Sequence, residues 1–266
     1  MLAHLVQTDI VWEDKHANYR QVDALLAGSA SRIGKGDVVV LPELFDTGFS
    51  FELSSTHDGD GQTLMYLCAL AKRLGCCVVG SRTRLGPDGK GRNCCPVIGP
   101  DGSLLAEYVK IHPFSIGKES QFFAGGSEIA VLPASPTGGT GLDMALAPTV
   151  CYDLRFPELY RKATLRGAEV FTIIANWPGA RSMHRRTLSI ARAIENQAFV
   201  LSLNRTGRDP NVVYDGASLV VDPTGAVLGE CDDAPQVLSV ELEHKTLVDW
   251  RHKFGVLRDI KLIGPD

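Results

Sequence analysis

Short apolar runs alternate along the chain with segments whose apolar residues recur every three or four positions. The run at 2–7 predicts a strand, the segment at 15–33 carries helical spacing from Tyr19 to Leu26, and the β-branched run at 37–41 predicts a second strand. The same alternation then predicts helices at 62–74, 157–166 and 181–195 and strands at 76–81, 142–150, 169–175 and 198–204.

In two regions, turn signals predict strands that follow one another without a helix between them. Pro-Asp-Gly turns at 87–89 and 100–102 bracket the run at 93–98, and 103–109 follows, which predicts antiparallel hairpins. The late part of the chain predicts strands at 212–221, 226–231 and 237–242, a Pro-Thr-Gly turn at 223–225, and a helix or tail at 247–258. We expect an α/β protein with a mixed sheet, or two packed sheets, and helices outside.

Composition narrows the class of protein. The chain has 266 residues, of which 44% are hydrophobic and 22% charged, so we expect one soluble domain over 1–266. A net charge of −4 without a basic stripe disfavours nucleic-acid binding. We find no apolar run of membrane-spanning length and no signal peptide at the first residues, and expect a cytoplasmic protein with no membrane partner.

Cysteine and histidine patterns bear on metals and disulfides. Seven cysteines, an odd number without a CxxC motif, disfavour a disulfide framework or a zinc site and fit a reducing cytosol. The seven histidines form no HExxH motif, so we expect no metal. The glycine-rich stretch at 134–141 is expected to be a surface loop; it opens no helix in a βαβ unit, so it is not a dinucleotide fingerprint.

Cys151 lies between a predicted strand and a predicted helix. It follows the run at 142–150, and Pro157 suits the first turn of a helix. This position exposes a side chain at the edge of a sheet near helix-end N–H groups, which favours a thiolate. Taken alone, the stretch also fits a buried structural cysteine.

Three chemically different side chains end three predicted strands. Glu43 follows 37–41, Lys110 follows 103–109, and Cys151 follows 142–150. Ligands commonly bind beyond the carboxyl ends of strands, and a base, a fixed cation and a nucleophile suit acyl transfer. On residue type alone, Glu43 and Lys110 also fit solvated charges.

These stretches resemble the three signatures of the nitrilase superfamily, the carbon–nitrogen hydrolases. They are Leu-Pro-Glu43, Lys110-Ile-His and Cys151-Tyr-Asp-Leu-Arg-Phe-Pro-Glu, in the order of the family. The segments at 175–184, 191–197, 204–209, 215–218 and 222–225 are also similar to that family, so the resemblance covers effectively the whole chain. The Asn-Trp-Pro and Ala-Arg-Ala-Ile-Glu-Asn-Gln segments look most like the omega-amidase branch, which hydrolyses the side-chain amide of 2-oxoglutaramate and related 2-oxo acid amides.

The resemblance implies a four-layer α-β-β-α sandwich, in which two mixed sheets pack face to face with helices outside. It implies no cofactor, a small-molecule amide as substrate, and a homodimer or higher homo-oligomer, with the tail at about 243–266 in the interface. Glu43, Lys110 and Cys151 match the catalytic residues of the family, and Glu119 matches its second glutamate. The chain lacks the acidic residue that many relatives carry after Phe114, which affects the expected loop shape and substrate fit.

The implied mechanism assigns roles to further residues. The backbone N–H of Tyr152 is expected to hold the oxyanion together with Lys110. Independently of that mechanism, Asn176 and Trp177 follow a predicted strand, and this position makes them candidates to line the same pocket; for Trp177, simple packing fits the sequence equally well.

Several charged residues and two histidines have no role in this scheme. A 2-oxo acid calls for a cationic partner, and the arginines at 181, 185 and 186 lie nearby without singling one out. We expect Arg155 to pair with Glu158 or another carboxylate, and Arg192 to pair with Glu195 on a helix surface. His112 and His184 are candidates for pocket contacts that the scheme does not need.

Other functions remain open from the sequence. Within the superfamily they are a nitrilase, a carbamoylase or an amidase for deaminated glutathione. A catalytically silent scaffold is the alternative from another class, and the filled catalytic positions disfavour it. A nucleotide- or metal-binding domain lacks its phosphate loop or ligand cluster.

Overall fold

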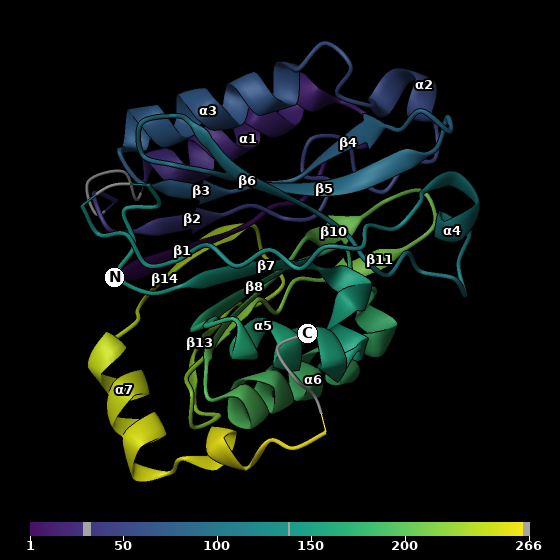
Figure 1. Cartoon of the computed structure of the whole chain (residues 1–266). Coiled ribbons are helices and arrows are strands. Elements are labelled where there is room, and N and C mark those ends of the chain that lie inside the picture. The colour runs from purple at the N-terminus through teal and green to yellow at the C-terminus, as the bar shows by residue number, and fades with distance from the viewer. Residues whose placement is uncertain (29–32, 138, 263–266) are drawn as a thin grey trace.

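The computed structural model describes residues 1–28, 33–137 and 139–262 (Figure 1). Its strands are β1 Leu2–Gln7, β2 Val38–Val40, β3 Cys77–Val79, β4 Arg82–Leu85, β5 Gly91–Ile98, β6 Leu104–Val109, β7 Leu146–Val150, β8 Val170–Ala175, β9 Phe199–Asn204, β10 Thr206–Arg208, β11 Val213–Asp215, β12 Leu219–Val221, β13 Val227–Glu230 and β14 Gln236–Glu241. Its α-helices are α1 Lys15–Ala27, α2 Leu53–Thr56, α3 Gln62–Leu74, α4 Glu119–Phe122, α5 Pro157–Leu165, α6 Ser182–Asn196 and α7 His244–Lys253; the 3₁₀ turns are η2 Cys151–Arg155, η3 Gly179–Arg181 and η4 Val256–Asp259.

Two mixed sheets form the centre of the molecule. The first has the order β14-β1-β2-β3-β5-β4, with β6 also paired to β5. Its β1, β2 and β3 run parallel, and the other pairs are antiparallel. The second has the order β13-β12-β9-β8-β7, in which β7, β8 and β9 run parallel. The predicted antiparallel hairpin around 93–109 is present as β5 and β6.

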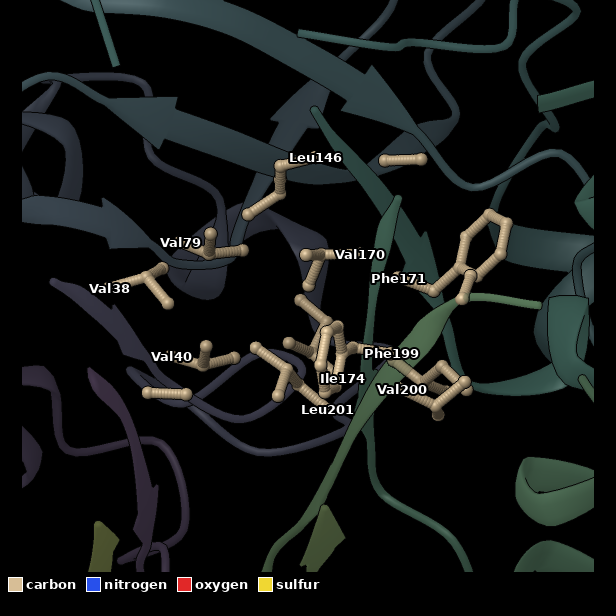
Figure 2. Close-up of a cluster of buried hydrophobic side chains, with 14 of the residues drawn as sticks. Val38, Val40, Val79, Leu146, Val170, Phe171, Ile174, Phe199, Val200 and Leu201 are labelled. Carbon is tan, nitrogen blue, oxygen red and sulfur yellow. The ribbon is translucent and has the colours of Figure 1, made fainter. Parts of the chain in front are cut away.

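The side chains of β2 contribute to two apolar cores, one on each face of the first sheet. Successive strand residues point to opposite faces of a sheet. Val38 and Val40 pack into the core between the two sheets, whereas Val39 packs under α1 and α3. Figure 2 shows part of this core. Val38, Val40 and Val79 of the first sheet face Leu146, Val170, Ile174, Phe199 and Leu201 of the second sheet in the layer between the sheets. Phe171 and Val200 point to the other face of the second sheet, where Phe171 packs against Tyr160 of α5.

Helices cover the outer face of each sheet. In Figure 1, α1 and α3 lie above the first sheet, and α5 and α6 lie below the second. Tyr19, Val22 and Leu67 face the first sheet from one side, and Leu159 and Ala193 join the core on the other. The predicted four-layer α-β-β-α sandwich is therefore confirmed. No helix in the described ranges is long and apolar enough to cross a membrane.

Two predicted elements had the wrong bounds. The helix predicted at 15–33 ends at Ala27; residues 29–32 lie outside the described ranges, and Ile33 is not helical. The strand predicted at 212–221 is two strands: β11 pairs with β10, and β12 pairs with β9. Gly216 and Ala217 separate them at positive φ (61° and 51°), a conformation that a continuous strand does not contain.

The last strand also lies in an unexpected place. The strand predicted at 237–242 is β14, which pairs with β1 at the start of the chain instead of extending the sheet that holds β12 and β13. Residue contacts over long sequence separations decide such a pairing, and local patterning does not report them. The short elements β4, β10, α2 and α4 were not predicted. In the predicted loop at 134–141, the described residues form no helix or strand; residue 138 lies outside them.

Candidate active site

Three strand ends meet at one pocket of about 250 Å³. Glu43 follows β2, Lys110 follows β6 and Cys151 follows β7, and all three line this pocket together with Glu119 from the start of α4. The first two come from one sheet and Cys151 from the other. The face-to-face packing of the sheets therefore brings together residues that are far apart in the sequence.

Lys110 lies between two carboxylates. Its Nζ donates to Glu43 Oε1 at 3.0 Å and to both oxygens of Glu119 at 3.0 and 2.9 Å. All three side chains are at most 2% exposed. Burial opposes the charge on Lys110, but Glu119 and Glu43 outweigh it and hold the pKa of Lys110 above its ordinary value. Burial also raises the pKa of Glu119, against the effect of Lys110.

The Glu43 carboxylate is held by further donors from both sheets. Asn93 Nδ2 on β5 donates to Oε1 at 2.7 Å, and the backbone N–H of Asn176, just after β8, donates to Oε2 at 2.8 Å. Asn176 Nδ2 also donates to the Glu43 carbonyl at 2.8 Å. These contacts fix the direction of the carboxylate. Sequence reasoning missed Asn93; its signal was a polar residue at the start of the otherwise apolar run at 93–98.

Cys151 begins a tight turn directly after β7. Its φ is +49°, in the left-handed region that non-glycine residues rarely adopt. The buried carboxylate of Asp153 supports this turn by accepting from the Val150 backbone N–H at 3.1 Å and from the Tyr108 hydroxyl at 2.7 Å. Strain of this kind persists where the surroundings over-determine the backbone, and it commonly marks functional sites.

The expected thiolate at Cys151 was wrong for the resting site. Burial raises the pKa of the Cys151 thiol well above its ordinary value, and the adjacent Glu43 carboxylate raises it further. Lys110 acts in the opposite direction and does not compensate. Cys151 is the first residue of a single short 3₁₀ turn, too short for the helix-end effect to outweigh these factors. The resting thiol is protonated, and its attack on a substrate needs a base.

Aromatic side chains form much of the remaining wall. Phe114 and Phe156 pack edge-on against the ring of Tyr152, and Arg155 lies 4.8 Å over the ring of Trp177. The aromatic residues that line the pocket are Phe49, Phe51, Phe114, Tyr152, Trp177 and Tyr214. The volume is below the roughly 300–1,000 Å³ usual for drug-sized ligands, so the pocket suits a small molecule.

Comparison with known proteins identifies the family. The carbon–nitrogen hydrolase family model matches residues 2–252. The chain belongs to the carbon–nitrogen hydrolases. It is 32% identical over 258 residues to the 2-oxoglutaramate amidase of Bacillus subtilis, covering 96% of each chain, and 34% identical over 257 residues to an omega-amidase of Yersinia enterocolitica, covering 96% of this chain and 94% of the relative.

A solved structure agrees with the architecture. A carbon–nitrogen hydrolase superfamily protein from Xanthomonas campestris, solved with an arsenic adduct in its active site, superposes with a TM-score of 0.88 at 32% identity. The match covers 99% of this chain and 98% of that one. The predictions of a nitrilase-type fold and of an amidohydrolase are confirmed.

The remaining predicted pocket residues of this carbon–nitrogen hydrolase lie in the pocket wall. Tyr152, Asn176 and Trp177 all line it. Trp177 is 3% exposed, its backbone N–H donates to Asn204 Oδ1 at 2.7 Å, and its indole N–H donates to the Arg181 carbonyl at 2.9 Å. Trp177 therefore packs structurally and borders the pocket at the same time.

Arg155 does not make the predicted ion pair. Within the described ranges it has no carboxylate partner; its guanidinium stacks on Trp177, and Nη2 lies 3.4 Å from His184 Nδ1. Arg155 lines the pocket, whereas Glu158 is an exposed residue of α5. The planar guanidinium of Arg155 gains a stacking contact with Trp177 on one face, while its other face can stay hydrated. This contact explains why Arg155 needs no carboxylate partner.

The prediction for Arg192 is correct in its partner and wrong in its exposure, and Arg185 makes contacts that the sequence did not indicate. Arg192 pairs with Glu195 at 2.8 Å as predicted, but Arg192 is buried, because its guanidinium also donates to the Leu154 carbonyl and supports the turn after Cys151. Arg185 is completely buried and donates to the carbonyls of Gly216 and Ala217.

Arg186, by contrast, pairs with Glu230 at the surface at 3.0 Å. Of these nearby arginines, only Arg181 lines the pocket together with Arg155.

The two histidines considered from the sequence lie beside the site. His112 donates its backbone N–H to Asp153 Oδ1 at 3.0 Å and stacks on Phe156, and His184 contacts Arg155. Neither is among the residues that line the pocket. Among the described residues, no group of three His, Cys, Asp or Glu side chains gathers in an arrangement that holds a metal ion, and the seven cysteines are free thiols.

Proposed function

We propose that this carbon–nitrogen hydrolase removes ammonia from the ω-amide of a small 2-oxo acid such as 2-oxoglutaramate or 2-oxosuccinamate, leaving the dicarboxylate. Relatives named 2-oxoglutaramate amidase and omega-amidase, which align with 96% of the chain, support this substrate class. The observation that carries the chemistry is the pocket in which Cys151, Glu43 and Lys110 lie together.

The first half of the proposed reaction forms a thioester. Glu43 takes the proton of the Cys151 thiol, and the sulfur attacks the amide carbonyl. Lys110 Nζ and the backbone N–H of Tyr152 stabilise the oxyanion that develops. Tyr152 is the second residue of a 3₁₀ turn, where backbone N–H groups have no partner within the turn. Glu43 then returns the proton to the leaving nitrogen, with Glu119 as a second candidate donor, and ammonia departs.

The second half of the proposed reaction hydrolyses the thioester. Glu43 takes a proton from an incoming water, which attacks the thioester carbonyl, and the Cys151 sulfur leaves and is reprotonated. The fixed direction of Glu43, with donors from Asn93 and Asn176 on its oxygens, supports a single carboxylate acting in both halves. The pocket of about 250 Å³ supports a substrate of few heavy atoms over a large peptide-like amide.

Ammonia release from 2-oxoglutaramate and from succinamate tests the proposal. The wild type is expected to turn over both amides, and Cys151→Ala is expected to lose this activity while keeping its circular dichroism spectrum and melting temperature. Near-normal activity in Cys151→Ala would overturn the chemistry. A wild type that releases no ammonia from either amide would reject the substrate class and turn attention to nitriles, carbamoyl amines and deaminated glutathione.

A further inference from the structure

The charges in the pocket are distributed unevenly. Near Cys151, two carboxylates share the single ammonium of Lys110, so this part of the pocket does not attract an anion. The third carboxylate that lines the pocket, Asp209, accepts from the Tyr214 hydroxyl at 2.6 Å and from two backbone N–H groups at 2.7 Å. The remaining charged residues that line the pocket are cations: Arg155, Arg181 and Lys118.

Arg181 has a fixed backbone and a free guanidinium. Its backbone N–H donates to the Pro178 carbonyl at 2.9 Å, and its carbonyl accepts the indole N–H of Trp177 at 2.9 Å. The guanidinium lies 5.5 Å over the ring of Phe114. Within the described part of the chain, that guanidinium makes no hydrogen bond or ion pair. Its five N–H donors are available to a ligand in the pocket.

The other arginines near the pocket are more constrained. Arg155 is stacked on Trp177 at 4.8 Å, and its Nη2 contacts His184. Arg185 is buried against backbone carbonyls, and Arg186 is paired with Glu230. Lys118 is exposed and lacks the planar fork that matches a carboxylate with two parallel hydrogen bonds.

We infer that Arg181 binds the free carboxylate of the substrate and thereby selects amides that carry an acid group at their far end. This inference rests on the proposed function. It also explains the orientation of the substrate: the carboxylate is attracted to Arg181 and is not favoured near Glu43 and Glu119, so the amide end reaches Cys151. Phe114 covers one face of the guanidinium, and both side chains line the pocket, so a stacked guanidinium keeps its N–H edge for a ligand.

A matched pair of substrates separates this role from general catalysis. Succinamate carries the carboxylate, and butyramide has a methyl group in its place. In Arg181→Gln, kcat/KM for succinamate is expected to fall about 10- to 100-fold, mainly through KM, because one charge-assisted contact is lost. The value for butyramide should stay within about twofold. Arg186→Gln removes the same charge five residues away, outside the pocket, and should change neither substrate. Equal losses for both substrates in Arg181→Gln would overturn the inference.

Ligand binding tests the inference without turnover. Calorimetric titration of 2-oxoglutarate into Cys151→Ala is expected to give saturable binding, which weakens at least about tenfold in Cys151→Ala/Arg181→Gln. Unchanged affinity, or no binding to Cys151→Ala, would overturn the role of Arg181. A wild type that hydrolyses neither 2-oxoglutaramate nor succinamate, but whose Cys151→Ala variant binds 2-oxoglutarate through Arg181, would reject the proposed reaction and retain the carboxylate site.

Discussion

Lys110 and Glu43 form a 3.0 Å hydrogen bond across 67 residues of sequence, with side chains 2% and 0% exposed. Two buried charges are stable together only if their mutual attraction and their other hydrogen bonds offset the loss of hydration. Here Asn93, Asn176 and Glu119 supply those additional contacts. The pair is therefore part of a network that depends on each of its members.

Removal of the cation is expected to reduce both activity and stability. Lys110→Met leaves Glu43 and Glu119 buried without their shared ammonium, which should cost about 3–5 kcal/mol of unfolding free energy at pH 7. Turnover should fall at least about 10²-fold, because an oxyanion donor is lost. Urea denaturation and ammonia release measure the two effects.

The pH dependence of the Lys110→Met deficit checks its cause. Without the ammonium, the two carboxylates favour their protonated forms, so the deficit should shrink as the pH falls from 8 toward 5. Lys110→Met/Glu119→Gln should recover part of the stability but not the activity. A deficit that is the same at pH 5 and pH 8 would contradict an electrostatic origin.

Replacement of Glu43 should change thiol reactivity and turnover in opposite directions. The Glu43 carboxylate helps to raise the pKa of Cys151. Glu43→Gln should therefore lower that pKa and increase the rate at which iodoacetamide alkylates Cys151 at pH 7, while amide turnover falls about 10²- to 10⁴-fold with the loss of the base. Mass spectrometry of the Cys151 peptide measures the alkylation. Slower alkylation in the variant would show that Glu43 does not hold the thiol in its protonated form.

Asp46 should make the protein less stable at neutral pH than at mildly acidic pH. Burial raises its pKa from 3.8 to about 6, although the Thr63 hydroxyl donates to it at 2.7 Å. A raised acid pKa favours the protonated folded state, so its stabilising effect is complete below pH about 4 and is lost as the pH rises to about 6.

The Asp46→Asn variant tests this pH effect. It should gain up to about 3 kcal/mol at pH 7 and lose part of the pH dependence between about 4 and 6. The exposed control Asp249→Asn should change stability by less than about 0.5 kcal/mol. Urea denaturation at several pH values measures these stabilities. An Asp46→Asn variant that is less stable than the wild type at pH 7 would refute the prediction.

Gly216 should tolerate no side chain. It separates β11 from β12 at a φ of +61°, and an added Cβ would lie 2.3 Å from Nε2 of Gln7. Gly216→Ala is expected to cost more than about 2 kcal/mol, of which backbone strain accounts for about 1–2. Gly89→Ala serves as the control, because Gly89 has a φ of +74° but nothing within 4 Å of an added Cβ. Equal melting temperatures for the two variants would show that the Gln7 contact is unimportant.

The sequence determined those features that depend on local spacing and residue type. The apolar run of β2, which has no polar face, and the helical face from Tyr19 to Leu26 indicated the layers, because a strand that is apolar on both faces must be covered on both and a helix buries its apolar face. The strand-end positions of Glu43, Lys110 and Cys151 also indicated where a site would form, because such ends collect at sheet edges.

The tertiary structure decided the features that depend on contacts between distant segments. The positive φ of Cys151, its raised pKa and the pairing of β14 with β1 arise from neighbours that no local pattern identifies. The same holds for Arg155, which stacks on Trp177 instead of forming an ion pair, and for Arg181, which is distinguished from nearby arginines by the pocket it lines. Hydrophobic periodicity is a property of a segment, whereas burial, electrostatic environment and hydrogen-bond partners are properties of the assembled fold.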